Sequence, residues 1–127
     1  MDRKELEEFI QTSYETEPDR PWAKYPDYLV FRHRKNKKWF ALLMNVPANK
    51  LGLQGEEGLD IVNLKCDPVL VASLCREPGF FPAYQMSKTK WISVALDGTV
   101  PEDQIRMLLD MSFEATREKS RSKGAAQ

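Results

Sequence analysis

Hydrophobic residues recur at helical spacing near the two ends of the chain, and they alternate or run together between those ends. Residues 2–17 show the helical pattern, which predicts an amphipathic helix. Asp2 followed by Glu5 matches a capping box at its start, and Pro18 is expected to end it. The apolar face of this helix consists of Leu6, Phe9, Ile10, Ser13 and Tyr14.

Residues 100–117 repeat this periodicity near the other end of the chain and predict a second long helix. Thr99 stands three residues before Glu102, which matches another capping box, so we expect Thr99 to cap this helix. The stripe that faces the core consists of Ile105, Leu108, Leu109, Ser112 and Phe113.

Five shorter runs have the composition of strands. Residues 28–34 and 39–46 are rich in aliphatic and aromatic side chains, and the short polar linker 35–38 predicts a hairpin. Residues 59–66 predict a third strand, and Asp67 followed by Pro68 predicts the cap and first turn of a short helix. The stretch 80–101 predicts two short strands joined by a polar turn at 87–90, with the second strand at 91–96.

The predicted order is therefore helix, three strands, helix, two strands, helix. Short connections between consecutive strands favour an antiparallel five-stranded sheet. Helices on one face of that sheet give a two-layer α+β sandwich whose other face is partly open.

Composition narrows the class of protein. The 127 residues suit one domain, expected at 1–117, followed by a polar tail at 118–127 that we expect to be flexible. Lys and Arg number 19 and Asp and Glu also 19, so the net charge is zero. This argues against indiscriminate binding to nucleic acid or membranes but leaves room for a local basic face.

Cellular location follows from two further observations. The chain starts with charged residues, and no apolar run approaches the roughly 18 residues of a membrane span, so we expect a cytoplasmic protein with no membrane partner. Its two cysteines, Cys66 and Cys75, are expected to be reduced thiols.

Several short motifs are distinctive when they are taken together. They are Lys38-Trp39-Phe40-Ala41, Asn63-Leu64-Lys65-Cys66-Asp67-Pro68, Phe81-Pro82-Ala83-Tyr84-Gln85-Met86-Ser87-Lys88, Trp91-Ile92 and Leu96-Asp97-Gly98-Thr99-Val100-Pro101. These motifs resemble those of the MmcQ/YjbR family of small bacterial proteins, and the resemblance covers nearly the whole chain. The resemblance implies a fold similar to that of type III secretion chaperones, with the order α-β-β-β-α-β-β-α. It also implies DNA binding.

The chain departs from the family pattern in its central turn. Family members often carry His at the position of Gln85 and Asn at the position of Ser87. Gln85 cannot titrate, so a role that needs an imidazole is not expected there.

Basic residues cluster at two predicted turns. Strand alternation places Arg32 and Arg34 on one face, close to Lys35, Lys37 and Lys38. Lys and Arg bind phosphates, and exposed aromatic rings stack on bases, so the two turns suggest a nucleic-acid surface. The alternative stays open that these lysines and arginines are only solvent-exposed turn residues with no ligand. The candidate phosphate contacts are Arg32, Arg34, Lys38, Lys88 and Lys90, and the candidate stacking residues are Tyr84 and Trp91.

Catalysis and protein binding are the two other classes of function that the sequence suggests. His33 is the only histidine, and we expect its basic neighbours to lower its pKa. No nucleophile, metal-binding or phosphate-loop motif accompanies it, so we expect no enzymatic activity, cofactor, metal or small-molecule substrate. The open sheet face, with Trp22, Tyr84 and Trp91, is the alternative: it suits a protein partner or a second copy of the chain, as in a chaperone-like adaptor.

Overall fold

The five strands and the three α-helices follow the predicted order. The computed structural model describes residues 1–117, so the tail predicted at 118–127 lies outside the described residues. Its elements are α1 (Arg3–Ser13), β1 (Leu29–Arg32), β2 (Trp39–Pro47), the 3-10 helix η1 (Ala48–Leu51), β3 (Gly58–Lys65), α2 (Pro68–Leu74), β4 (Phe80–Pro82), β5 (Trp91–Ala95) and α3 (Glu102–Thr116).

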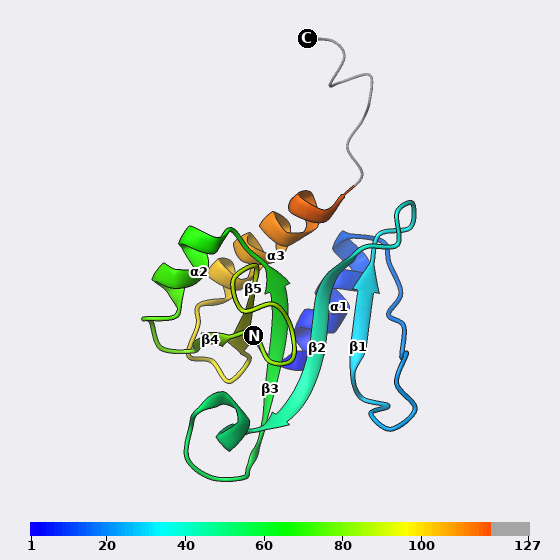
Figure 1. The fold of residues 1–127 in the computed structure, drawn as a ribbon. Coiled ribbons are helices and arrows are strands. Elements are labelled where there is room, and N and C mark those ends of the chain that lie inside the picture. The colour runs from blue at the N-terminus through cyan, green and yellow to red at the C-terminus, as the bar shows by residue number, and fades with distance from the viewer. Residues whose placement is uncertain (118–127) are drawn as a thin grey trace.

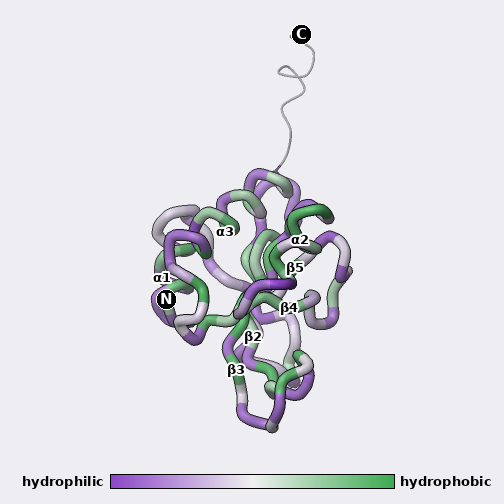
Figure 2. The backbone as a smooth tube through the Cα atoms, turned by 90° about the vertical axis from the view of Figure 1, so that its left-hand side faces the viewer, coloured by the Kyte–Doolittle hydropathy of each residue, from purple (hydrophilic) through white to green (hydrophobic). Residues whose placement is uncertain are grey.

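All neighbouring strands are antiparallel, and their spatial order is β1-β2-β3-β5-β4. The strand β5 thus lies between β3 and β4, although β4 precedes it in the chain (Figure 1). The helices α1 and α3 lie behind the sheet in this view, and the far end of the β2–β3 hairpin projects beyond the rest of the molecule (Figure 1, Figure 2). The predicted α+β class is confirmed.

The larger core lies between the helices and one face of the sheet. Fully buried side chains from α1, β1, β2 and α3 meet there, because each element turns its apolar positions to the same side. Large members of this core are Leu6, Ile10, Phe31, Phe40 and Leu109.

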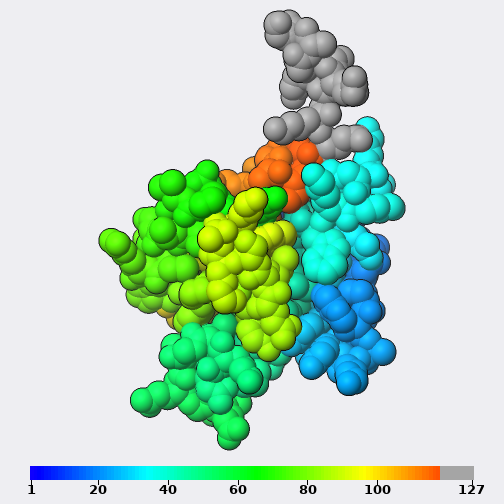
Figure 3. Space-filling view, in the orientation of Figure 1, coloured from blue at the N-terminus to red at the C-terminus, as the bar shows by residue number. Residues whose placement is uncertain are grey.

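The opposite face carries a second, smaller hydrophobic cluster, which consists of Tyr28, Val30, Leu42, Met44, Val46 and Ile61. No helix of the described chain covers it. Side chains from two irregular segments pack on it instead, Trp22 from the connection before β1 and Tyr84 and Met86 from the connection before β5. The face is therefore partly covered by loops, and the space-filling view shows the yellow-green segment lying across it (Figure 3).

Helix starts were predicted with mixed success. Asp2 and Glu5 form the predicted capping box, with both hydrogen bonds at 2.9 Å. The capping box predicted for Thr99 is wrong, because α3 starts after Pro101 with no side-chain cap. The Thr99 N–H instead donates to Asp97 Oδ1 at 3.0 Å, so the preceding turn holds this residue away from the helix end.

Several boundaries differ from the prediction as well. The first helix ends at Ser13 instead of residue 17, since Glu15 adopts a φ of 49° that leaves the helical region. The strand β1 ends at Arg32 instead of residue 34, because its register with β2 shifts between Phe31 and Arg32. Only three residues form β4, so an eight-residue connection, 83–90, replaces the four-residue turn expected there.

None of the helices formed by residues 1–117 combines the length and apolar composition that crossing a bilayer requires. Within the same part of the chain, Cys66 and Cys75 are free thiols, as predicted. No group of three or more His, Cys, Asp or Glu side chains there is arranged to hold a metal ion.

Candidate functional site

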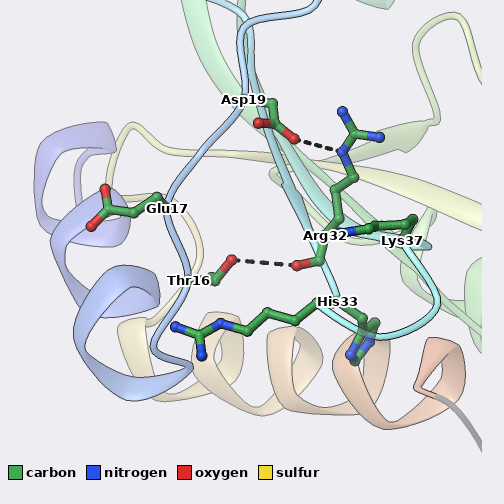
Figure 4. Close-up of a pocket in the computed structure, with 7 residues that line it drawn as sticks. Thr16, Glu17, Asp19, Arg32, His33 and Lys37 are labelled. Carbon is green, nitrogen blue, oxygen red and sulfur yellow. Dashed lines mark hydrogen bonds and ion pairs between the residues drawn. The ribbon is translucent and has the colours of Figure 1, made fainter.

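A polar hollow of about 390 Å³ lies beside the β1–β2 hairpin, where the chain leaves α1 and runs along the sheet edge (Figure 4). Three of its side chains come from the connection after α1 and four from the hairpin. They are Thr16, Glu17, Asp19, Arg32, His33, Arg34 and Lys37. We call this the polar hollow.

Arg32 is held in place at the upper wall of the polar hollow (Figure 4). Its Nε donates to Asp19 Oδ2 at 2.6 Å, and Asp19 is itself fixed by two backbone hydrogen bonds with Val30 at 2.8 and 2.9 Å. The Thr16 hydroxyl donates to the Arg32 carbonyl at 3.3 Å. Because only Nε is paired with a carboxylate within residues 1–117, the two terminal nitrogens of the guanidinium remain available to an anion.

His33 joins the hairpin to the end of α3. It is 9% exposed, and its ring lies 4.3 Å from that of Phe113. Its Nε2 lies 2.9 Å from Thr116 Oγ1, and the Thr116 hydroxyl donates to the Ser112 carbonyl at 2.8 Å. The imidazole therefore has a structural partner in Thr116 at the end of α3.

The pKa of His33 is lowered, as predicted, but the stated cause was wrong. Burial is the largest cause, and Arg117, directly after α3, lowers the pKa further, while a backbone hydrogen bond at Phe113 acts in the opposite sense. The strand neighbours proposed from the sequence are not among these causes.

The hairpin turn presents a dense set of cations. Arg34, Lys35, Lys37 and Lys38 are all exposed, and none of them has a carboxylate within 4.0 Å among the described residues. Asn36 fixes the turn, since its amide nitrogen donates to the Thr116 carbonyl at 2.9 Å and its oxygen accepts from the Lys38 N–H. The turn is therefore a positively charged projection with a defined backbone.

The second predicted turn belongs to the eight-residue connection 83–90. Lys88 Nζ donates to the Ala83 carbonyl at 2.7 Å and so closes the connection on itself. Lys90 is exposed, and Tyr84 and Trp91 are half-buried. Both aromatic residues are therefore only partly accessible to solvent, and Tyr84 packs against the smaller hydrophobic cluster.

The structure brings some of the predicted residues together and keeps others apart. Arg32 and Arg34 line the polar hollow with Lys37, whereas Lys88 and Lys90 are not part of its wall. The two turns approach each other on the second face of the sheet, where Trp39, directly after Lys38, lines a hollow with residues 85 and 86. Figure 3 shows the yellow-green connection beside the cyan hairpin on this face.

Sequence reasoning missed the acidic side of the polar hollow. Asp19 contacts Arg32 only because residue 19 forms an isolated β-bridge with Val30 at the sheet edge. No periodicity marks a single bridge, so the segment 18–27 reads as a loop. Glu17 was missed because the sequence predicts it inside the helix 2–17, whereas α1 ends at Ser13; its carboxylate accepts from Gln11 at 3.0 Å.

Comparisons with known proteins agree with this fold. A family model described as YjbR matches residues 14–115. The chain is 43% identical over 117 residues to YyaQ, an uncharacterized protein of Bacillus subtilis (strain 168), and the match covers 92% of this chain and 99% of that protein.

Solved structures show the same likeness. The crystal structure of a Pseudomonas syringae protein is 47% identical with a TM-score of 0.90, covering 92% of this chain and 100% of that one. A Deinococcus radiodurans protein, 21% identical with a TM-score of 0.67 over 91% of this chain and 82% of that one, shares the fold alone. As its sequence motifs predict, the chain belongs to the YjbR family.

Proposed function

We propose that this protein binds DNA through the cations of its two turns. The observation that carries the proposal is the hairpin segment 32–38, in which five of seven consecutive residues are Lys or Arg and none is acidic. A zero net charge then means that the compensating carboxylates lie elsewhere, as on α1, which carries Glu5, Glu7 and Glu8. A local excess of this kind attracts a polyanion without making the whole protein basic.

The contacts would differ between the two turns. The guanidinium of Arg32, oriented by Asp19, suits a two-pronged contact with one phosphate, and Arg34 extends the same wall. The lysines 35, 37 and 38 are flexible point charges that follow a backbone without reading its sequence. Lys88 uses one ammonium proton on the Ala83 carbonyl, which leaves two for phosphate oxygens.

We propose binding without catalysis, in the cytoplasm. His33 has its Nε2 committed to Thr116, and burial lowers its pKa, so it is a poor general acid. Burial also raises the pKa of the thiols of Cys66 and Cys75, which disfavours the nucleophilic thiolate. Reduced thiols suit the cytoplasm.

The test compares two double variants with equal change in charge. Lys35→Gln with Lys38→Gln removes two hairpin cations, and Lys4→Gln with Lys50→Gln removes two exposed cations from other elements. Each lost phosphate contact lowers the slope of log K against log salt by about 0.9, so the hairpin variant should lose about 1.8. At about 0.1 M salt its affinity for duplex DNA should fall roughly eightfold per contact, while the control variant keeps both values.

Fluorescence anisotropy with a labelled duplex across a range of salt concentrations measures both quantities. Equal losses in the two variants would assign the effect to net charge and contradict the proposed surface. A wild-type dissociation constant weaker than roughly 100 µM at low salt would reject DNA binding altogether, because non-specific binders reach about 10⁻⁴ to 10⁻⁶ M at physiological salt.

A protein-binding adaptor is the second candidate, and the second face of the sheet favours it. Tyr25 is 49% exposed there beside half-buried Trp22 and Met86. A partner or second copy held by this face would remain bound after nuclease treatment and at high salt, since apolar burial does not depend on counterion release. Size-exclusion chromatography under both conditions separates the two candidates.

A further inference from the structure

The second face of the sheet contains a small hollow with aromatic walls. Its volume is about 120 Å³, and it lies between the connection before β1, the start of β2 and the connection before β5. Its lining residues are Trp22, Tyr25, Tyr28, Trp39, Leu42, Met44, Gln85 and Met86. We call this the aromatic hollow.

The rings are arranged around a space and do not fill it. Trp22 stands edge-on to Trp39 at 5.7 Å and 87°, and edge-on to Tyr28 at 6.0 Å and 81°. Tyr25 is stacked on Tyr28 at 4.7 Å and 15°. Buried Leu42 and Met44 form the apolar floor. Sites for drug-sized ligands occupy about 300–1,000 Å³, so this much smaller volume suits only one planar ring system.

Gln85 supplies the amide group in this wall. It is exposed and has a φ of 58°, a left-handed conformation that costs energy for a residue other than glycine. An amide offers both a donor and an acceptor, the combination that the hydrogen-bonding edge of a nucleobase requires.

A buried hydrogen-bond network fixes the residue next to Gln85. Asn63 Nδ2 donates to the Tyr84 carbonyl at 3.0 Å, and the Tyr84 N–H donates to Ser93 Oγ at 2.9 Å. Ser93 Oγ in turn donates to Asn63 Oδ1, and both Asn63 and Ser93 are 0% exposed. The position of Gln85 at the aromatic hollow is therefore held by β3 and β5.

The charged residues next to the lining residues in sequence indicate which kind of ligand the aromatic hollow would bind. Lys24 and Lys38 directly precede Tyr25 and Trp39, both are exposed, and neither has a carboxylate within 4.0 Å among residues 1–117. Asp27 is the one acidic residue adjacent in sequence to the lining residues. Asp27 acts on the wall itself, since burial raises the pKa of Tyr28 and the charge of Asp27 helps to raise it. The two lysines still outnumber this carboxylate among the sequence neighbours of the lining residues, and an excess of positive charge disfavours a cationic guest and favours a ring attached to phosphate.

We propose that the aromatic hollow takes one unstacked base of a single-stranded nucleic acid, with the Gln85 amide contacting the edge of the base. The inference rests on the proposed binding of nucleic acid and adds a preference for single strands. The rings of Trp22 and Trp39 contact the base, while the hairpin cations bind the adjoining phosphates. The base enters from an unpaired strand, because a stacked base pair does not fit a hollow of this size.

The test uses an octamer of thymidylate and an abasic octamer with the same number of phosphates. We expect the thymidylate octamer to bind roughly fivefold to hundredfold more tightly, since one base stacked on an aromatic residue contributes about that factor. In NMR spectra it should shift the indole N–H signals of Trp22 and Trp39, and the abasic octamer should leave them in place. Gln85→Gly suits the left-handed backbone, and it should reduce the affinity for the thymidylate octamer only.

Each other result overturns the inference in a distinct way. Equal affinity for the two octamers would reject the base site and leave phosphate binding intact. Binding of neither octamer would reject the base site, while the duplex titration described above decides the proposed function separately. If N-acetyltryptophanamide shifts the indole signals and thymidylate does not, the aromatic hollow accepts a protein side chain and the base site is rejected.

Discussion

The hydroxyl group of Ser112 on α3 replaces a direct backbone hydrogen bond between β2 and β3. The last paired residues of these two strands are Ala41 and Leu64, so the same register would next place Phe40 opposite Lys65. Instead, the Ser112 hydroxyl donates to the Phe40 carbonyl at 2.6 Å and accepts from the Lys65 N–H at 2.9 Å. The residue is 0% exposed, so the two strands and the helix meet at one oxygen atom without water.

Ser112→Ala removes both hydrogen bonds and leaves two backbone groups without these partners. Leaving one buried polar group unpaired costs about 1–3 kcal/mol, so with two such groups we expect the free energy of unfolding to fall by about 2–6 kcal/mol. Alanine has the higher helix propensity, which returns only a few tenths of a kcal/mol. The loss should therefore far exceed that of an exposed serine in a helix.

Urea unfolding measures this difference, with Ser13→Ala as the matched control. The sequence predicts Ser13 on the apolar face of α1, but the structure leaves it exposed at the end of the helix. The control should be neutral or slightly stabilising, and the m-value of both variants should equal that of the wild type. A loss below about 0.5 kcal/mol for Ser112→Ala would refute the reasoning, because it would mean that β2 and β3 close the gap with a direct hydrogen bond.

Three further outcomes are expected. The pKa of His33 is lower in the folded protein than the unfolded value of about 6.5, so the neutral side chain contributes stability above that pH, and this contribution is lost as the pH falls through the folded pKa. The free energy of unfolding of His33→Gln should therefore change less between about pH 7.5 and 5 than that of the wild type. Gly79→Ala should lower the stability measured by thermal unfolding by about 3 kcal/mol, since the new Cβ would lie 2.6 Å from a Val100 methyl carbon. Gly98→Ala is the control: Gly98 has a similar φ but no atom within 4 Å of the new Cβ, so the loss should be only about 1–2 kcal/mol. Ser93→Ala should destabilise the protein by about 1–3 kcal/mol and speed hydrogen exchange in the connection before β5.

Each of these expectations has a clear contrary result. An unchanged pH dependence in His33→Gln would show that another group titrates with folding. Equal losses at Gly79 and Gly98 would leave backbone strain as the whole cost, without a steric clash. Unchanged exchange rates in Ser93→Ala would show that the connection is held by its apolar contacts.

Local patterns in the sequence were sufficient for the element order and for most of the core. The stripe from Ile105 to Ser112 is buried as predicted, because a helix repeats the same contacts every turn. The cap at Asp67 also formed, with Oδ1 accepting from the Val69 N–H at 2.9 Å. The capping box predicted at Thr99 did not form. Threonine also suits a turn, and the Thr99 N–H donates to Asp97 within the preceding turn.

The candidate site was predictable only where it is contiguous in sequence. The cations of residues 32–38 lie together because one hairpin carries them. The pairing of Arg32 with Asp19, and the meeting of Trp39 with Gln85 and Met86, depend on segments far apart in the chain. Which strands become neighbours decides these contacts, and no local periodicity encodes that choice. DNA binding by the predicted residues stays a prediction.

The placement of β5 between β3 and β4 affects how the chain is completed during synthesis. In the described chain β4 pairs with β5 alone, and the free edge of β3 is occupied only by β5. A nascent chain that has emerged as far as residue 90 therefore presents the Ile61–Lys65 edge of β3, on the side away from β2, as an unpaired template. This edge lies next to apolar surface that α3 has yet to cover. Ribosome stalling or truncation in this interval would favour edge-to-edge aggregation, whereas the arrival of five residues, Trp91–Ala95, closes that edge and gives β4 its partner.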